Sequence, residues 1–296
     1  MEFNWQYQAQ TPTTIKLFLK HLDIPRAFTS WVKFSGSILL NHQAVTVRQT
    51  IQAGDILTLV APDELGYETV APALDGVEVV YEARDVLVVN KPVDVVSIPS
   101  IKNPSSSMAN RIRGYYVQEN YADQVIHIVT RLDRDTSGLM LIAKHRLAHA
   151  LLDRQIQAQQ INKIYYAISS RAEWPLHGMI DAPIARDEDS IITRRVHESG
   201  KAATTEYWLE AGLKDSSLLR LQLHPGRTHQ IRVHMKHMGG PLVGDDLYGG
   251  ELEVPLTRQA LHCGELSFKQ PFTNEPIVVK QDLPDDMQEW ILLHRQ

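Results

Sequence analysis

The feature that most constrains the fold is a series of short apolar runs that starts near residue 77. Each run spans five to seven residues, which is typical of strands. Helical patterns interrupt the runs at 107–119, 145–157 and 228–238, and a last one at 285–294 closes the chain. Four helices are too few for strict strand–helix alternation. The pattern predicts an α+β domain over 77–296, with flanking helices and a mixed, largely antiparallel central sheet. The expected strands are 77–81, 86–90, 125–130, 139–143, 163–169, 204–209 and 218–224.

A separate small unit precedes this domain. A short helical pattern from Ile15 stops at the Ile24–Pro25 step, because a residue before proline disfavours helix. A second helical pattern, 27–34, ends at Gly36, and strand-like runs follow at 37–40 and 56–60. Prolines and acidic residues dominate the stretch after them. We therefore predict a small α/β domain at 13–60 and a linker at 61–76.

The composition indicates a globular protein, with 43% hydrophobic and 22% charged residues. A single cysteine, Cys263, excludes an internal disulfide framework and a multi-cysteine zinc site, and it suits a reducing compartment. No apolar run approaches the ~20 residues that span a bilayer, and the N-terminus lacks the pattern of a signal peptide. We expect a cytoplasmic protein without a membrane partner.

The net charge of −5 conceals an uneven distribution of charge. Residues 1–61 carry five basic and three acidic residues, whereas 63–85 carry seven acidic residues and one arginine. Residues 224–237 hold two arginines and a lysine without any acidic residue. The acidic total therefore does not exclude a nucleic-acid partner, because the basic residues are local.

The segment TRLDRDTSG, residues 130–138, lies between two apolar runs. Two strands flanking this polar loop would present Asp133 at the end of a sheet, where catalytic groups are often held. For an isolated aspartate the more common explanation is a turn, in which Asp133 or Asp135 accepts backbone N–H groups. The rest of the sequence decides between the two.

Further blocks flank this segment in a fixed order along the chain. NKP at 90–92 precedes it; KIYYA at 163–167, GKAATTEY at 200–207, HPGRTHQIRVHM at 224–235, GDDLYG at 244–249 and RQALHC at 258–263 come after it. With these blocks the chain resembles the RluA family of pseudouridine synthases over about 77–281. The usual signature of that family is H-R-L-D-x-x-T-S-G. The resemblance implies the pseudouridine synthase fold with a catalytic cleft.

The small unit has a resemblance of its own. Its two short helices, followed by Asn41-His42 and Gly54-Asp55, are similar to the small RNA-binding domain named after ribosomal protein S-four. That domain often precedes this catalytic domain.

The resemblance implies the isomerisation of uridine to pseudouridine in RNA. The N1–C1′ bond breaks and the uracil rejoins through C5, without redox change, so no cofactor is expected. The reaction needs a carboxylate as nucleophile or base and a cation that keeps it ionised. Asp133 matches the essential aspartate, and Arg227 matches its arginine partner. Tyr165 matches the active-site tyrosine, which can stack on uracil or assist loss of the C5 proton, while Tyr166 should face the other way.

RNA contacts are expected around the cleft and on the small domain. Arg131 can fill the space that the flipped base leaves, or contact phosphate. Lys91 and Lys201 are also expected at the cleft, but a solvated surface position without RNA contact is an equal alternative for both. The residues predicted to bind RNA are Arg131, Lys91, Lys201, Lys16, Arg26 and Lys33. The resemblance implies ribosomal or transfer RNA as the substrate, and we expect a monomer.

Some positions depart from the family pattern. Thr130 replaces the usual histidine, and His224-Pro225 stands where a threonine is more common. Asp94 replaces a glycine and puts the path of the loop after Pro92 in question. His145 and His149 share a helix face, but no metal-binding motif accompanies them, so we expect no metal.

Two other functions compete with the isomerase. A non-catalytic RNA-binding or ribosome-assembly factor would keep the basic surface and dispense with Asp133. A carboxylate-dependent hydrolase would need a second acid, and no comparable block supplies one. Two mechanisms also stay open, because Asp133 can attack the sugar or the uracil ring, or abstract a sugar proton.

Overall fold

The apolar runs form strands of one ten-stranded sheet in the computed structural model, which describes residues 1–66, 70–190 and 192–295. The order is β12-β15-β16-β11-β17-β10-β8-β7, with β18 beside β17 and β9 beside β10. The β10–β17 pairing is parallel and the other pairings described in this sheet are antiparallel, so the predicted mixed, largely antiparallel sheet is confirmed. The strands are β7 (Glu78–Glu82), β8 (Val86–Lys91), β9 (His127–Ile128), β10 (Ser137–Ala143), β11 (Asn162–Ser169), β12 (His177–Asp181), β15 (Thr204–Gly212), β16 (Ser217–His224), β17 (Leu261–Lys269) and β18 (Pro276–Lys280).

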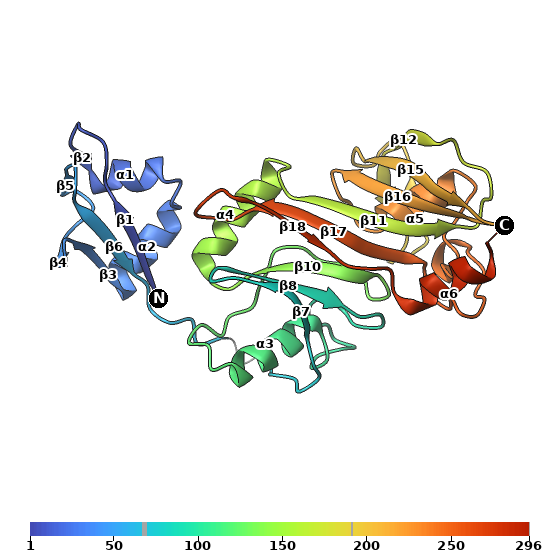
Figure 1. Cartoon of the computed structure of the whole chain (residues 1–296), viewed down its shortest axis with the longest axis horizontal. Helices are drawn as coiled ribbons and strands as arrows, with labels where there is room; N and C mark the ends of the chain where they lie inside the picture. The colour runs from blue at the N-terminus through green and yellow to red at the C-terminus, as the bar shows by residue number, and fades with distance from the viewer. Residues whose placement is uncertain (67–69, 191, 296) are drawn as a thin grey trace.

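Helices flank this sheet, as predicted. Figure 1 shows α3 near β7 and β8, and α5 near β15 and β16, at opposite ends of the sheet order. Apolar residues of α3, α4 and α5 join those of the strands in one buried core. The helices are α3 (Met108–Gln118), α4 (Arg146–Gln157), α5 (Gln230–His237) and α6 (Asp285–Leu293); a short 3-10 turn, η1 (Asp246–Tyr248), and a strand pair, β13 (Ile184–Arg186) with β14 (Arg194–Val196), complete the domain. None of the helices among the described residues has the length and apolar character that crossing a bilayer requires.

The small N-terminal domain starts earlier than predicted. β1 pairs with β6 along its whole length, so the domain begins at the second residue and not at residue 13. Phe3 and Trp5 alternate with polar residues in this strand, and Phe3 is buried. The two predicted helices are present, and the strands form a four-stranded sheet of order β1-β6-β3-β4 and a separate pair, β2 with β5. The elements of the domain are β1 (Glu2–Gln6), β2 (Thr13–Thr14), α1 (Ile15–His21), α2 (Arg26–Ser35), β3 (Ser37–Leu40), β4 (Gln43–Ala44), β5 (Thr50–Ile51) and β6 (Ile56–Val60).

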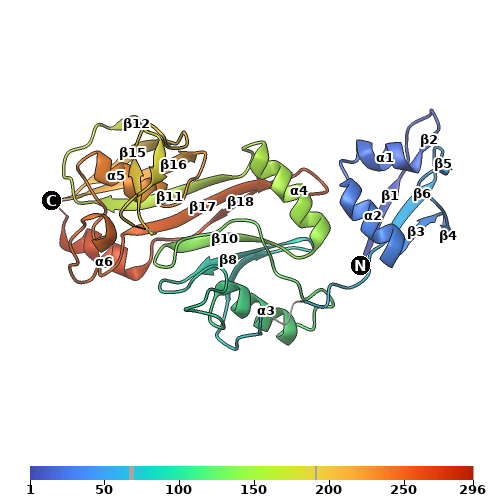
Figure 2. The same ribbon diagram turned by 180° about the vertical axis from the view of Figure 1, so that it is seen from behind.

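The small domain packs on α4 of the large one, and the view from behind in Figure 2 also places α4 between the two. Leu147 and Leu151 of α4 belong to the buried core of the small domain. Phe3 stacks on Phe272 with ring centroids 5.7 Å apart, and the Arg146 guanidinium lies 4.4 Å from the centre of the Trp31 ring. These apolar and cation–π contacts fix the orientation of the small domain.

The described parts of the predicted linker, residues 61–66 and 70–76, bond to the large domain, and 67–69 lie outside the described residues. The Glu64 carboxylate is buried, accepts a hydrogen bond from the backbone N–H of Arg146 at 2.8 Å and pairs with His127 at 3.0 Å. Farther along, the backbone N–H of Ala73 donates to the carbonyl of Asn110. Both described parts of the linker are thus bonded to the large domain.

The sheet differs from the prediction in one shortened strand, β9, and in three strands that were not predicted, β12, β17 and β18. β9 keeps only two residues of the expected strand 125–130, because the chain beyond it turns into the polar loop. β17, a central strand between β10 and β11, was not predicted at all. His262 and Gly264 interrupt the apolar pattern of its first half, which is buried on both faces, and alternation appears only in the five residues from Glu265 to Lys269.

Candidate active site

Asp133 lies on the loop between β9 and β10, and neighbouring side chains fix that loop. Ser97 Oγ donates to the carbonyl of Leu132 at 2.7 Å and accepts from the backbone N–H of the same residue at 3.1 Å. Gly138 ends the loop with φ +111°, and a Cβ there would come within 2.3 Å of the carbonyl oxygen of Cys263 in β17. The signature therefore needs its glycine, because β10 and β17 approach closely at that point.

Lys91 is a structural residue of this loop, so its predicted contact with RNA is wrong. Its side chain is fully buried, and Nζ donates to the carbonyls of Pro92, Val95 and Arg134 at 2.6–2.7 Å. Burial lowers the pKa of Lys91 to about 7, while the three acceptors match the three donors of the ammonium form. Lys91 thus joins the loop after β8 to the residue that follows Asp133.

We expect Lys91→Met to destabilise the protein by about 2–4 kcal/mol, because three buried carbonyls lose their donor. Urea denaturation would measure the free energy of unfolding. Lys102→Met, a change in an exposed lysine of a nearby loop, is the matched control and should leave stability within about 0.5 kcal/mol. An equally small effect at Lys91 would contradict the structural role.

The arginine beside Asp133 is Arg232, not the predicted Arg227. Arg232 Nη1 lies 4.0 Å from Asp133 Oδ2. Its guanidinium binds Asp245 through two hydrogen bonds of 2.8 and 2.6 Å, and Asp245 is fully buried. Burial alone would lower the pKa of Arg232, but the bonds with Asp245 and the charge of Asp133 outweigh burial and raise it. Arg232 is therefore a permanent, fixed cation facing the Asp133 carboxylate.

Arg227 lies at the exposed rim instead. It precedes α5, and its Nε donates to the carbonyl of Ala202 at 3.2 Å. Arg232 sits inside α5 with its side chain turned to the buried face of that helix. The helical position, rather than the order in the motif, decides which arginine meets Asp133.

A cleft of about 1060 Å³ opens in front of Asp133. Its described lining includes one carboxylate, that of Asp133, and five arginine or lysine side chains. The acidic protein therefore has a strongly basic cleft. The five basic residues are Arg131, Arg134, Lys163, Arg227 and Arg232.

Tyr165 lines this cleft, while Tyr166 lies against Gly264 on the other face of β11. The pairing of β11 with β17 shifts register between Ile164 and Tyr165, a bulge that aims the Tyr165 ring. Burial raises the pKa of Tyr165 to about 12, against the opposing charge of Lys163, whose Nζ lies 5.6 Å from the ring centre. The phenol is thus protonated at neutral pH, which suits stacking or hydrogen-bond donation better than removal of a proton.

The other residues predicted to bind RNA are exposed. Arg131 lines the cleft two residues before Asp133. Lys201 is also exposed, but it is not part of the described cleft lining; its backbone pairs with Ile184. Exposed cations on α1 and α2 complete the set: Lys16, Arg26 and Lys33.

Two of the three departures from the family pattern, at Thr130 and Asp94, have structural explanations. Thr130 is buried, and its Oγ1 accepts a hydrogen bond from the backbone N–H of Leu141 at 2.9 Å. Asp94 has φ 57°, the left-handed conformation that glycine favours and aspartate tolerates. His145 begins α4 and contacts Asp85 at 3.0 Å, while His149 stacks on His127.

His229, which lies beside Asp133, and Tyr248, which contacts His229, were not predicted as site residues. His229 Nε2 lies 3.8 Å from Asp133 Oδ2, and His229 Nδ1 lies 2.8 Å from the hydroxyl of Tyr248. Both are in motif blocks, HPGRTHQIRVHM and GDDLYG, which lie far from Asp133 in the sequence. Their position in these blocks could have marked His229 and Tyr248 as candidate site residues, but only the fold shows that the two side chains are in contact.

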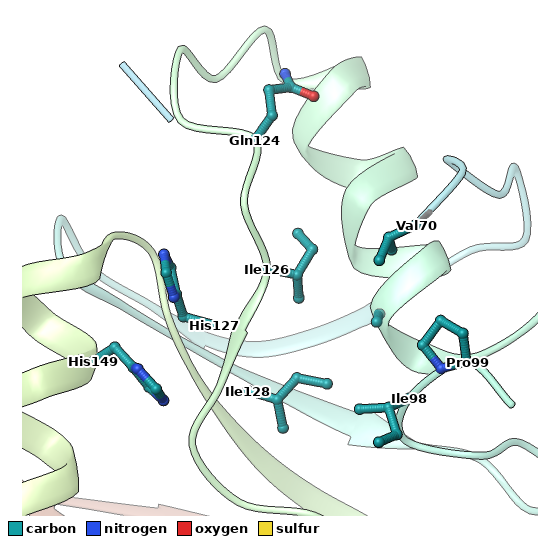
Figure 3. Close-up of a pocket in the computed structure, with 9 residues that line it drawn as sticks. Val70, Ile98, Pro99, Gln124, Ile126, His127, Ile128 and His149 are labelled. Carbon is teal, nitrogen blue, oxygen red and sulfur yellow. The ribbon is translucent and has the colours of Figure 1, made fainter. Parts of the chain in front are cut away.

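A second hollow, of about 300 Å³, lies next to the cleft (Figure 3). Ile98 and Pro99 border both spaces. Its lining is mainly apolar, and the stacked rings of His127 and His149 close one side. None of the predicted site residues lines it.

Comparison with known sequences gives a consistent set of similarities. Residues 85–237 match the family model described as RNA pseudouridylate synthase. The chain is 41% identical over 279 residues to the uncharacterized RNA pseudouridine synthase YjbO of Bacillus subtilis, covering 94% of this chain and 98% of the relative. It is 34% identical over 274 residues to the ribosomal large subunit pseudouridine synthase D of Xanthomonas campestris, covering 88% and 81% of the two chains.

Comparison with solved structures supports the fold. Human RNA pseudouridylate synthase domain containing 4 superposes with a TM-score of 0.60 at 21% identity, covering 73% of this chain and 92% of its own. Human RNA pseudouridylate synthase domain containing 1 gives a TM-score of 0.58 at 25% identity, with 75% and 95% coverage.

Proposed function

The chain belongs to the RNA pseudouridylate synthase family, and we propose that it uses Asp133 to convert uridines of large-subunit ribosomal RNA into pseudouridine. The family makes it an RNA pseudouridine synthase, an isomerase; the aspartate and the choice of RNA are the proposal. Relatives named as ribosomal large subunit pseudouridine synthase D support that RNA over transfer RNA.

The observation that carries the proposal is the charge of the cleft. Five basic side chains and one carboxylate face a space of about 1060 Å³. The cations attract the phosphate backbone, and the single carboxylate faces the reaction centre. The hydrolase alternative needs two carboxylates about 5–10 Å apart, and the described lining offers one.

The roles of the residues follow from their geometry. Asp133 attacks the uridine, or removes a sugar proton, and in both routes its Oδ2 faces the Arg232 guanidinium, whose Nη1 is 4.0 Å away. The N1–C1′ bond breaks, the C5–C1′ bond forms, N1 gains a proton and C5 loses one to solvent. The buried ring of Tyr165 stacks on the uracil while it turns, and its phenol donates a hydrogen bond.

Recognition of the RNA uses two places. A uridine must leave its stack to reach Asp133, and the exposed Arg131 occupies the vacated space or contacts phosphate. The small domain, which we propose to be an RNA-binding domain of the S-four type, presents cations on α1 and α2. Because it is packed on α4, it forms a second contact at a fixed distance from the cleft.

Mapping of pseudouridine in total RNA tests the proposal. We expect one or more pseudouridines of large-subunit ribosomal RNA to disappear when the gene is deleted and to return with the wild-type gene. Loss confined to transfer RNA would overturn the choice of RNA. An unchanged map in a deletion strain would overturn the proposed function, and growth rescue by Asp133→Asn would favour the assembly-factor alternative.

A further inference from the structure

A chain of hydrogen-bonding groups ends beside Asp133 and has no part in the reaction as described so far. The backbone N–H of Arg194, in β14, donates to the Tyr248 hydroxyl at 2.9 Å. That hydroxyl lies 2.8 Å from His229 Nδ1, and His229 Nε2 lies 3.8 Å from Asp133 Oδ2. Tyr248 lies in η1, His229 directly precedes α5, and Asp133 lies in the loop between β9 and β10.

The Tyr248 hydroxyl has a defined direction. Tyr248 is 2% exposed, and burial raises its pKa, so the hydroxyl keeps its proton. Its oxygen already accepts the N–H of Arg194. The hydroxyl proton therefore points at His229 Nδ1, the acceptor at hydrogen-bond distance.

The direction of the Tyr248 hydroxyl proton determines the tautomer of the His229 imidazole. Burial lowers the pKa of His229, against the charge of Asp133, so the ring favours its neutral form. A neutral ring that accepts at Nδ1 carries its proton on Nε2. Nε2 is the nitrogen that faces the Asp133 carboxylate. The opposite tautomer would place a lone pair against a carboxylate.

We propose that Tyr248 is a positioning residue, which holds His229 as the Nε2–H tautomer so that His229 donates a hydrogen bond to Asp133. The gap of 3.8 Å closes when Asp133 engages the target nucleotide, since catalytic hydrogen bonds often tighten only in the complex. Together with Arg232, the donor restrains the carboxylate from a second direction. The kinetic part of this inference depends on the proposed function; the tautomer does not.

Nuclear magnetic resonance of the imidazole nitrogens tests the tautomer without any assay of activity. The full-length protein would be labelled with ¹⁵N-histidine, and the spectrum of His229→Asn would identify the His229 signals among the 13 histidines. At neutral pH we expect Nδ1 of His229 to be unprotonated and Nε2 protonated, with a mixture of tautomers in Tyr248→Phe. A protonated Nδ1 in the wild type, or no change in Tyr248→Phe, would overturn the proposal.

Kinetics test the effect on Asp133. His229→Asn suits the left-handed backbone at φ 57° and keeps an amide near Tyr248, but it does not reach Asp133. His229→Gln places an amide N–H near the position of Nε2. For His229→Asn and Tyr248→Phe we expect kcat to fall about 10- to 100-fold with unchanged KM for RNA, the loss of one hydrogen bond to a charged group. His229→Gln should recover at least about tenfold over His229→Asn.

The double variant separates positioning from packing. If Tyr248 acts through His229, Tyr248→Phe should change kcat less than about twofold in the His229→Asn background. Additive losses, or a rise in KM in place of a fall in kcat, would contradict the proposal and show a purely structural role. If the wild-type protein showed no Nε2–H tautomer of His229 and also formed no pseudouridine, both the role of Tyr248 and the proposed function would be contradicted.

Discussion

Asp133→Asn should abolish pseudouridine formation, lowering its rate by about 10⁴-fold or more. Asparagine has nearly the shape of aspartate, so the loop should keep its bonds to Ser97 and Lys91. Its amide, however, neither attacks carbon nor accepts a proton as a carboxylate does. The rate would be measured as tritium released to water from RNA that carries [5-³H]uridine, prepared from cells without the gene.

The neighbouring aspartate provides the matched control. Asp135 lies in the same loop, and its carboxylate pairs with the exposed Arg134 at 2.9 Å. Such a surface pair contributes little, so Asp135→Asn should release tritium at a rate within about tenfold of wild type. If Asp135→Asn lost as much activity as Asp133→Asn, the loop rather than one carboxylate would be responsible.

Arg232→Gln should lose both stability and activity. Removal of the guanidinium leaves the fully buried Asp245 carboxylate without its two hydrogen bonds, at a cost of about 3–5 kcal/mol. It also removes the fixed cation 4.0 Å from Asp133. Urea denaturation would give the free energy of unfolding, and the tritium assay would give the rate.

Two further variants separate the two losses. Arg232→Gln combined with Asp245→Asn removes the buried charge and should recover most of the stability while activity stays low. Arg227→Gln, at the exposed rim, should change stability by less than about 0.5 kcal/mol. Full recovery of activity in the double variant would contradict the role of Arg232 beside Asp133.

Local patterns predicted much of the fold. The strands β8, β10, β11 and β16 are apolar runs with clear ends, so periodicity found them. β17 was not predicted because His262 and Gly264 interrupt the apolar residues of its first half, which is nevertheless buried in the fold. β1 escaped although Phe3 and Trp5 alternate, since five residues at a terminus are a weak signal without knowledge of the partner strand.

The candidate site was predictable only in part, for a similar reason. Motif resemblance located Asp133 and Tyr165, which line one cleft. It could not choose between Arg227 and Arg232, because the choice depends on where α5 begins and which face it buries. Lys91 gave the same signal as a surface lysine, since its three partners are backbone carbonyls, which no sequence pattern shows. A net charge likewise cannot reveal a cleft with five cations.

The fate of the uracil tests the central claim most directly. Wild-type protein would be incubated with the [5-³H]uridine RNA, and released tritium, pseudouridine and free uracil would be measured together. We predict equal amounts of tritium and pseudouridine and no free uracil, all dependent on Asp133. Release of free uracil would make the protein a hydrolase, and the absence of both tritium and uracil at physiological salt would leave RNA binding without catalysis; either result would contradict the account.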